Sequence, residues 1–272
     1  MDQHTVERYR FAADRADLVL APGERLVAGG TWLFSDPDPH TTGLVDLTRM
    51  GWTPWQRTDT GLSIAATCTL ADVVAFSQRP PDPGWTAAPL FEASCHALLA
   101  SWKIWNLATV GGNVARAFAA GAMVSLLVTL DAEAVVWTPD GGERRADVVS
   151  LVAGNGVSTL ARGEVLRSFE IAERALRATT SLHKIALAEL GRSGAVVSGR
   201  RDEDGSLTIV VTAATSTPRR LRYATPPTTA RVRADVEALP DFYTDPLGTA
   251  DWRRGVAAEL AGRVLTDLGG PR

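Results

Sequence analysis

The sequence predicts an α+β protein built in three parts, and three observations support this fold class. Apolar runs of strand length alternate with helical periodicity in the first half of the chain. Beyond about residue 178, strands come first and a helix comes last. Two Gly-Gly pairs follow apolar segments, in AGGT at 28–31 and ATVGGN at 108–113. We therefore expect a small α/β lobe over residues 1–54, a larger α+β lobe over 55–175, and an antiparallel sheet with a helix over 176–272.

The elements of the first two parts follow from periodicity and turn signals. Residues 5–20 predict a short amphipathic helix, and residues 25–28 and 44–47 predict short buried strands. In the second part we expect strands at 62–66, 133–137 and 164–171 and helices at 89–104 and 120–130. A further helix is predicted to begin at a capping box formed by Thr69 and Asp72. Turns are predicted at 80–84 and 139–142.

The third part has the pattern of an antiparallel meander that ends in a helix. Strands are predicted at 182–188, 195–199 and 207–214, with a hairpin turn at 202–205. The Thr-, Pro- and Arg-rich stretch 215–230 predicts a loop. The closing helix is predicted at 249–268, where an apolar side chain recurs every fourth residue at Trp252, Val256, Leu260, Val264 and Leu268.

Composition limits the functional classes. Apolar residues make up 45% of the chain, and the formal net charge is −3, so neither a nucleic-acid nor a membrane partner is indicated. Only Cys68 and Cys95 are cysteines, which is too few to bind an iron–sulfur cluster or a structural zinc. The first residues form no apolar signal segment, and no apolar run reaches the roughly 18 residues of a membrane span. We expect a cytoplasmic protein without a metal site.

The glycine pairs are the strongest candidates for a ligand site. Glycine lets a backbone amide approach a ligand closely, and consecutive N–H groups after a strand can surround an anion such as a pyrophosphate. A single pair taken alone favours a tight turn over a ligand site. The patterns of the P-loop and of the Rossmann dinucleotide fold are both absent. The sequence thus favours a diphosphate-containing ligand outside those two classes.

The order of the segments resembles a known family. The matching segments are LVAGGTWL at 26–33, LVDLTRM at 44–50, LSIAATCTLADV at 62–73, NLATVGGNVARAFAAGAMVSLLVTLDAEAVVW at 106–137, GEVLRSFEI at 163–171, HKIALAELGRSGAVVSGRR at 183–201, GSLTIVVTAATSTPRRLR at 205–222 and DPLGTADWRRGVAAELAGRVL at 245–265. Together they resemble the FAD-binding (medium) subunit of the molybdenum hydroxylases, the group of carbon monoxide dehydrogenase, xanthine dehydrogenase and aldehyde oxidoreductase. The resemblance implies a two-lobed FAD-binding domain followed by a C-terminal domain.

The resemblance also implies a set of site residues for non-covalent FAD. Residues 26–33 would surround the pyrophosphate and ribityl chain, namely Leu26, Val27, Ala28, Gly29, Gly30, Thr31, Trp32 and Leu33. Thr109, Gly112 and Asn113 would contact it from the other lobe, together with Ala115 and Gly121. Ala100, Ile104 and Ala108 would pack on the adenosine, and Leu166 and Lys184 would lie near the isoalloxazine. No catalytic residue is implied.

The family's activity implies partners. A large subunit would hold molybdopterin and oxidise the substrate, and a small subunit would hold two [2Fe–2S] clusters, in a dimer of heterotrimers. Electrons would pass through FAD to NAD or another acceptor. An alternative is an assembly scaffold of the same fold that has lost or weakened flavin binding. A stand-alone flavin oxidase has no support, because no acid–base group accompanies either glycine pair.

Several positions depart from the family pattern. Trp32, Phe118, Ala119 and Ala122 stand where polar residues or proline are usual, and KIWN at 103–106 replaces a usual QIRN-like run. We therefore expect FAD to be held mainly by backbone amides. Trp32, Trp102 and Trp105 are interpreted either as core or interface anchors or as residues that cover the cofactor. Tryptophans 52, 55 and 85 are predicted in loops, as markers of a subunit contact.

Overall fold

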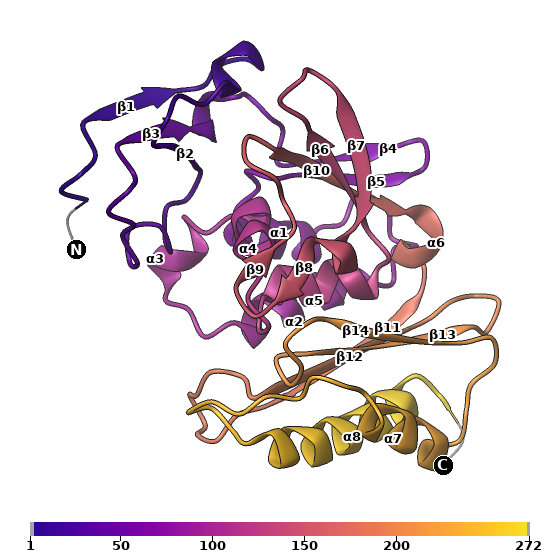
Figure 1. Ribbon diagram of the computed structural model, residues 1–272. Helices are drawn as coiled ribbons and strands as arrows, with labels where there is room; N and C mark the ends of the chain where they lie inside the picture. Colours follow the sequence, from indigo (N-terminus) through magenta and orange to yellow (C-terminus); the bar gives the residue numbers. More distant parts are fainter. Residues whose placement is uncertain (1–2, 271–272) are drawn as a thin grey trace.

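The computed structural model describes residues 3–270, and Figure 1 shows the first lobe set apart from the rest at the N-terminal end. This lobe is a three-stranded sheet in the order β1-β3-β2, with β1 at Arg8–Phe11, β2 at Glu24–Val27 and β3 at Gly43–Asp46. Both outer strands pair parallel with β3. The central strand is buried throughout, as its apolar sequence requires. Two 3-10 turns complete the lobe, η1 at Ala16–Leu18 and η2 at Leu47–Arg49.

The predicted helix over residues 5–20 is wrong. Residues 8–11 form β1, and only residues 16–18 are helical, as a 3-10 turn. β1 instead pairs with the edge of β3 through backbone hydrogen bonds, in a register that runs from Arg8 opposite Gly43 to Phe11 opposite Asp46. Tertiary pairing therefore overrides a weak helical periodicity in this segment.

The second lobe is built on a five-stranded antiparallel sheet in the order β4-β5-β10-β6-β7. Its strands are β4 Trp55–Thr58, β5 Gly61–Ala65, β6 Glu133–Trp137, β7 Glu143–Asp147 and β10 Val165–Ala172, and a small ribbon adds β8 Val152–Gly154 and β9 Val157–Ser158. Its helices are α1 Leu70–Gln78, α2 Ala88–Ala97, α3 Trp102–Trp105, α4 Val110–Arg116, α5 Ala122–Thr129, α6 Glu173–Leu176 and the 3-10 turn η3 Val148–Leu151. The capping box at Thr69 and Asp72 is confirmed at the start of α1.

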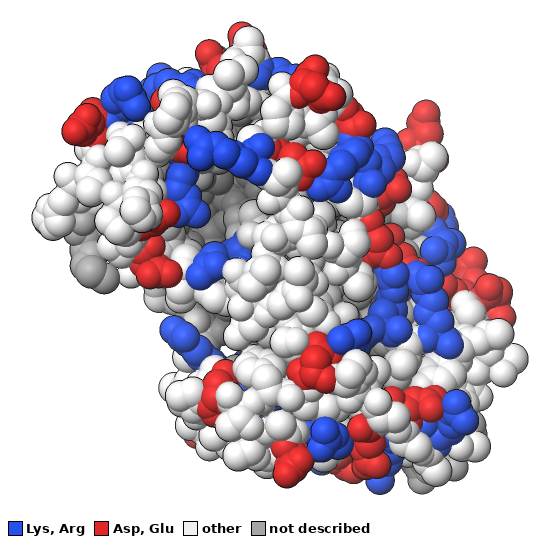
Figure 2. Space-filling model, viewed as in Figure 1, with Lys and Arg blue, Asp and Glu red and all other residues white. Residues whose placement is uncertain are grey.

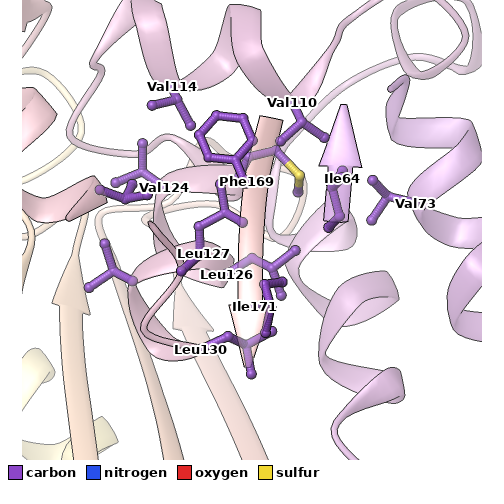
Figure 3. Close-up of a cluster of buried hydrophobic side chains, with 14 of the residues drawn as sticks. Ile64, Val73, Val110, Val114, Val124, Leu126, Leu127, Leu130, Phe169 and Ile171 are labelled. Carbon is purple, nitrogen blue, oxygen red and sulfur yellow. The ribbon is translucent and has the colours of Figure 1, made fainter. Parts of the chain in front are cut away.

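The central core lies between this sheet and its helices. In Figure 3, Val110 and Val114 of α4 point toward Phe169 of β10 and its neighbours. The predicted helix over 89–104 is too long, because Leu98 is extended and Ser101 caps a separate α3. Trp85 lies in the loop before α2, as predicted, but its side chain is buried in this core, so the prediction of a subunit contact there is wrong. Trp55 likewise packs edge-to-face on Phe76, at 5.2 Å between ring centroids.

The third part is a four-stranded antiparallel sheet in the order β11-β12-β13-β14, with two helices beneath it in Figure 1. The strands are β11 Thr179–Ile185, β12 Ala195–Arg201, β13 Leu207–Thr212 and β14 Arg219–Tyr223, and the helices are α7 Thr229–Glu237 and α8 Ala250–Asp267. The loop predicted over 215–230 is wrong in its middle, where β14 forms. Its residues alternate in period 2: Leu221 and Tyr223 pack on the core, whereas Arg220 and Arg222 reach Asp131.

An ion-pair network joins the second and third parts. The Asp131 carboxylate accepts hydrogen bonds from Arg200 at 2.7 Å, Arg220 at 3.0 Å and Arg222 at 2.7 Å. Although burial opposes ionisation, Arg200 and Arg222 hold the pKa of Asp131 below its usual range. The division after residues 54 and 175 into separate domains stays a prediction. No helix within residues 3–270 has the length and apolar character needed to cross a membrane.

Candidate functional site

The first glycine pair and helix α4, which carries the second pair, come together where the first and second lobes meet, because a Cβ on Gly29 would contact Leu107 and Ala108 just before α4. The first pair follows β2, and the second belongs to α4; Figure 1 draws α4 beside the loops of the first lobe. Figure 2, in the same view, shows the surface hollowed at this place, with basic side chains around it. The order of strands and helices thus brings together two segments that are about eighty residues apart in the sequence.

The first segment offers free hydrogen-bond donors. Among the described residues, no acceptor faces any backbone N–H from residue 28 to residue 33. The carbonyls of the same segment are used locally, because Gly30 and Trp32 accept from the amides of Phe34 and Ser35, at 2.9 and 2.8 Å. These residues, apart from Trp32, are only partly exposed. Consecutive unpaired amides in a partly buried turn are a suitable cradle for an anion.

The two positions of the first pair require glycine for different structural reasons. A Cβ on Gly29 would lie 1.7 Å from the Leu107 carbonyl oxygen, so the two lobes approach each other here at backbone distance. Gly30 has φ +64°, the left-handed conformation that other residues adopt at a cost. Gly29 therefore joins the lobes, and Gly30 turns the chain.

The second pair is not a loop, because it forms the first turn of α4. Thr109 is the N-cap, and its hydroxyl accepts from the Gly112 amide at 3.1 Å. The Val110 amide donates to the Cys68 carbonyl, and the Gly111 amide donates to the Ala66 carbonyl, both at 2.8 Å. The expectation of a second cradle of free amides is therefore wrong: these N–H groups already have partners within the protein.

The glycines of the second pair also differ from each other. Gly111 is buried, and a Cβ there would lie 2.5 Å from the Ala66 Cβ. Gly112 is exposed, and its Cβ would meet only the Thr109 hydroxyl within 4 Å, at 3.0 Å. Ala115 lies three residues further along and is exposed too. Gly112 and Ala115 therefore share one face of α4, which presents a smooth wall without large side chains.

The carbonyl oxygen of the Asn113 side chain is hydrogen-bonded within the protein, whereas its amide nitrogen is not. Its Oδ1 accepts from the Met123 amide at 2.9 Å and so caps the start of α5. A Cβ on the buried Gly121 would lie 3.1 Å from the same oxygen. The Asn113 Nδ2 has no acceptor within residues 3–270 and stays available as a donor.

The residues predicted near the adenosine lie around α3. Ala100 precedes α3, Ile104 is within it, and Ala108 follows it; all three are partly exposed. The Ala108 amide donates to Ile104 at 2.7 Å, which compacts this stretch beside the Gly29 contact. Trp102 is 81% exposed, so it is not a core residue. Trp105 stands edge-to-face to His96, with 4.9 Å between the ring centroids.

The two residues predicted near the isoalloxazine have different surroundings. Leu166 is buried in β10 opposite Val136, close to the position where α4 packs on that strand. Lys184 is exposed on the edge strand β11, and its ammonium donates to the His96 carbonyl at 2.9 Å. Lys184 is thereby tied to the chain that leads into α3, not to the first glycine pair.

Sequence reasoning missed the contact that Trp32 makes. Its ring meets Phe118 edge-to-face with centroids 4.5 Å apart, and the Arg116 guanidinium lies over both rings, at 5.2 and 4.3 Å. Trp32 and Phe118 were both noticed as departures from polar residues. Nothing in the sequence signalled that they touch, since they belong to different lobes.

Comparison with known proteins identifies the family. A model of the FAD binding domain in molybdopterin dehydrogenase matches residues 9–172, which is more than half of the chain. The chain belongs to this FAD-binding family. A search of curated proteins finds no match to this sequence.

Solved structures agree with the fold of this FAD-binding chain. Carbon monoxide dehydrogenase from Hydrogenophaga pseudoflava matches with a TM-score of 0.82 at 18% identity, over 97% of each chain. The reconstituted CO dehydrogenase from Oligotropha carboxidovorans matches with a TM-score of 0.81 at 20% identity, over 96% of each chain. Quinoline 2-oxidoreductase from Pseudomonas putida 86 matches with a TM-score of 0.76 at 18% identity, over 96% of this chain and 95% of that chain.

The donor set of the FAD-binding chain fits a dinucleotide better than a metal. Residues 3–270 contain no group of three or more His, Cys, Asp or Glu side chains arranged to hold a metal ion. Both cysteines are buried free thiols, and desolvation raises the pKa of Cys95 to about 12. The free amides of residues 28–33, the Asn113 amide and the smooth face of α4 are instead the groups that a diphosphate and a sugar chain require.

Proposed function

We propose that this chain is the FAD-carrying electron-transfer subunit of a molybdenum hydroxylase complex. The observation that carries the proposal is the run of free amides at residues 28–33, opposite the smooth face of α4. A pyrophosphate has the charge and the acceptor oxygens that such a run of donors requires. Membership of the family selects FAD among the ligands that contain a diphosphate.

Each wall of the hollow then has a role in holding the non-covalent cofactor. Residues 28–33 bind the pyrophosphate and the ribityl chain through backbone N–H groups, and Leu26 and Val27 of β2 lead into this segment. Gly112, Asn113 and Ala115 form the opposite wall, where Asn113 donates from Nδ2, and the buried Thr109 and Gly121 support this wall from behind. Ala100, Ile104 and Ala108 pack on the adenosine. Leu166 and Lys184 lie toward the isoalloxazine, where an ammonium stabilises negative charge on the reduced ring.

The bound flavin supplies electron transfer, and the partner subunits supply the remaining chemistry. One structural relative is a Cu,Mo-CO dehydrogenase, which supports a large molybdopterin subunit as partner. A small subunit with [2Fe–2S] clusters completes a heterotrimer, of which two copies form the complex. NAD or another acceptor takes the electrons from the flavin. The substrate is oxidised on the large subunit, outside this chain.

Purification of the complex from its native source tests this proposal. We expect a yellow complex with flavin absorbance near 450 nm, with a large and a small chain that co-purify. Elemental analysis should find molybdenum and iron in proportion to the flavin. A complex that holds both metals and both partners but no flavin would contradict the proposal and favour the assembly scaffold.

A matched pair of glycine variants tests the placement of the flavin. Gly112→Val puts a branched side chain on the smooth face of α4, so we expect loss of bound FAD from a folded protein. Gly255→Val is the control, because Gly255 also lies exposed within a helix and has no atom within 4 Å of its Cβ position. Flavin content per chain, from absorbance after gel filtration, is the measurement. Normal flavin content in Gly112→Val would overturn the placement.

A further inference from the structure

The first and second lobes meet at two separate points along α4. At the N-terminal side, Gly29 approaches the Leu107 carbonyl at backbone distance. At the C-terminal side, Trp32 meets Phe118 and Arg116. Helix α4 has 7 residues, so the two contacts are about 10 Å apart along its axis. The smooth face at Gly112 and Ala115 lies between them.

The second contact, which we call the interlobe cluster, comprises Trp32, Asp36, Arg116 and Phe118. The Arg116 Nη1 donates to the Gly156 carbonyl at 3.3 Å, which anchors the guanidinium to the second lobe. The Arg116 Nη2 lies 3.8 Å from the Asp36 carboxylate of the first lobe. The same guanidinium covers both aromatic rings. Arg116 therefore connects the lobes through its charge and its flat face.

The cluster is next to the free amides. Trp32 is itself one of the residues whose N–H has no acceptor within residues 3–270, and its carbonyl accepts from the amides of Ser35 and Asp36 at 2.8 and 3.0 Å. The Trp32 ring thus holds the cradle segment in place from its outer end. A ligand in the cradle would be enclosed between the Gly29 contact and this cluster.

We propose that the interlobe cluster is a closure that retains the flavin, and that its opening limits cofactor exchange. This inference rests on the proposed function. The aromatic pair and the cation add attraction between the lobes. Trp32 and Phe118 therefore act as positioning residues, which keep the cradle against α4 and need no polar contact with the flavin.

The release of FAD tests the closure. Phe118→Ser and Trp32→Ala should each speed release of FAD from the purified complex about tenfold, because each removes the ring pair and half of the cation contact. The double variant should release FAD at most about twice as fast as the faster single variant, because both changes remove the same interaction. Release is followed by the fluorescence of free FAD after dilution.

The matched control is Phe11→Ser. Phe11 also stands edge-to-face to an aromatic ring, that of Tyr9 at 5.3 Å, and also lies under a guanidinium, that of Arg49 at 3.8 Å. All three residues belong to the first lobe, so this contact joins no two lobes. The release rate in Phe11→Ser should equal that of the unaltered protein. Equal release rates in Phe118→Ser, Trp32→Ala and the unaltered protein would overturn the closure and leave the proposed function intact.

Hydrogen exchange of the flavin-free chain provides a readout that does not depend on the cofactor. The amides of Phe34, Ser35 and Asp36 are bonded to the carbonyls of Gly30 and Trp32 and report on the order of the cradle. Their exchange should be at least several-fold faster in Phe118→Ser than in Phe11→Ser. If the purified complex binds no FAD, the proposed function fails. Unchanged exchange in Phe118→Ser would then reject the closure separately.

Discussion

The two glycine pairs are alike in sequence, but their backbone amides differ in whether they have hydrogen-bond acceptors. At Gly29-Gly30 the backbone amides have no acceptor within the described chain, whereas at Gly111-Gly112 the amides are bound to Ala66 and to the Thr109 hydroxyl. In each pair one glycine serves close packing, Gly29 against Leu107 and Gly111 against Ala66. Of the other two glycines, Gly30 turns the chain at φ +64°, and Gly112 is exposed on α4. A Gly-Gly motif therefore identifies a place of close approach, and its hydrogen bonds decide whether it can bind an anion.

The largest effect is expected from Gly111→Val. The new side chain would begin 2.5 Å from the Ala66 Cβ and 2.8 Å from its carbonyl oxygen, both within the buried core. We expect a loss of roughly 3 kcal/mol in the free energy of unfolding, at the upper end for an overpacked core. Urea unfolding measures it beside Gly112→Val, which should lose less than about 1 kcal/mol at an exposed position. Equal losses in the two variants would remove the distinction within this pair.

Gly29→Ala should be the next most costly change. Its Cβ would stand 1.7 Å from the Leu107 carbonyl oxygen, and backbone on both sides must move to make room. We expect a loss of about 2 kcal/mol in the free energy of unfolding, together with weaker flavin retention because the lobes separate. Thermal unfolding and flavin content are measured together. Unaltered stability would show that the lobes are not in backbone contact at this glycine.

Thr109→Ala makes the second pair resemble the first. The variant removes the N-cap and leaves the Gly112 amide without its acceptor. We expect a loss of about 1 kcal/mol in the free energy of unfolding, and Thr109→Ser should restore most of it because serine caps equally well. A Thr109→Ser variant as unstable as Thr109→Ala would contradict the capping role.

The smallest effect concerns pH and the strand that leads into the first pair. Arg10 and the Ala21 amide bind the Glu24 carboxylate and lower its pKa to about 2. A lowered pKa stabilises the fold above the ordinary pKa of 4.5, and this stabilisation is lost as the pH falls toward 2. The melting temperature of the unaltered protein should therefore exceed that of Glu24→Gln at pH 6, and the gap should shrink by pH 3. A gap independent of pH would contradict this assignment.

Local sequence signals predicted many elements of the structure. The capping box at Thr69, a strand before Gly29 and the four-residue periodicity of α8 all appear where they were predicted, although only Glu24 and Val27 of that strand are buried. Each depends on neighbours within a turn or two, so a single segment contains the whole signal. The helix predicted over 5–20 failed because β1 forms only when β3 is present to pair with it.

The sequence by itself determined the α+β class, the family and the positions of the glycine pairs, because composition, periodicity and motif order are properties of the chain alone. Only the tertiary structure decided which amides are free, since the acceptors for Val110 and Gly111 come from residues more than forty positions earlier. It also decided that Trp32 faces Phe118 across the lobes. Hydrogen bonds and ring contacts between distant segments depend on where the fold places them, which local sequence does not specify.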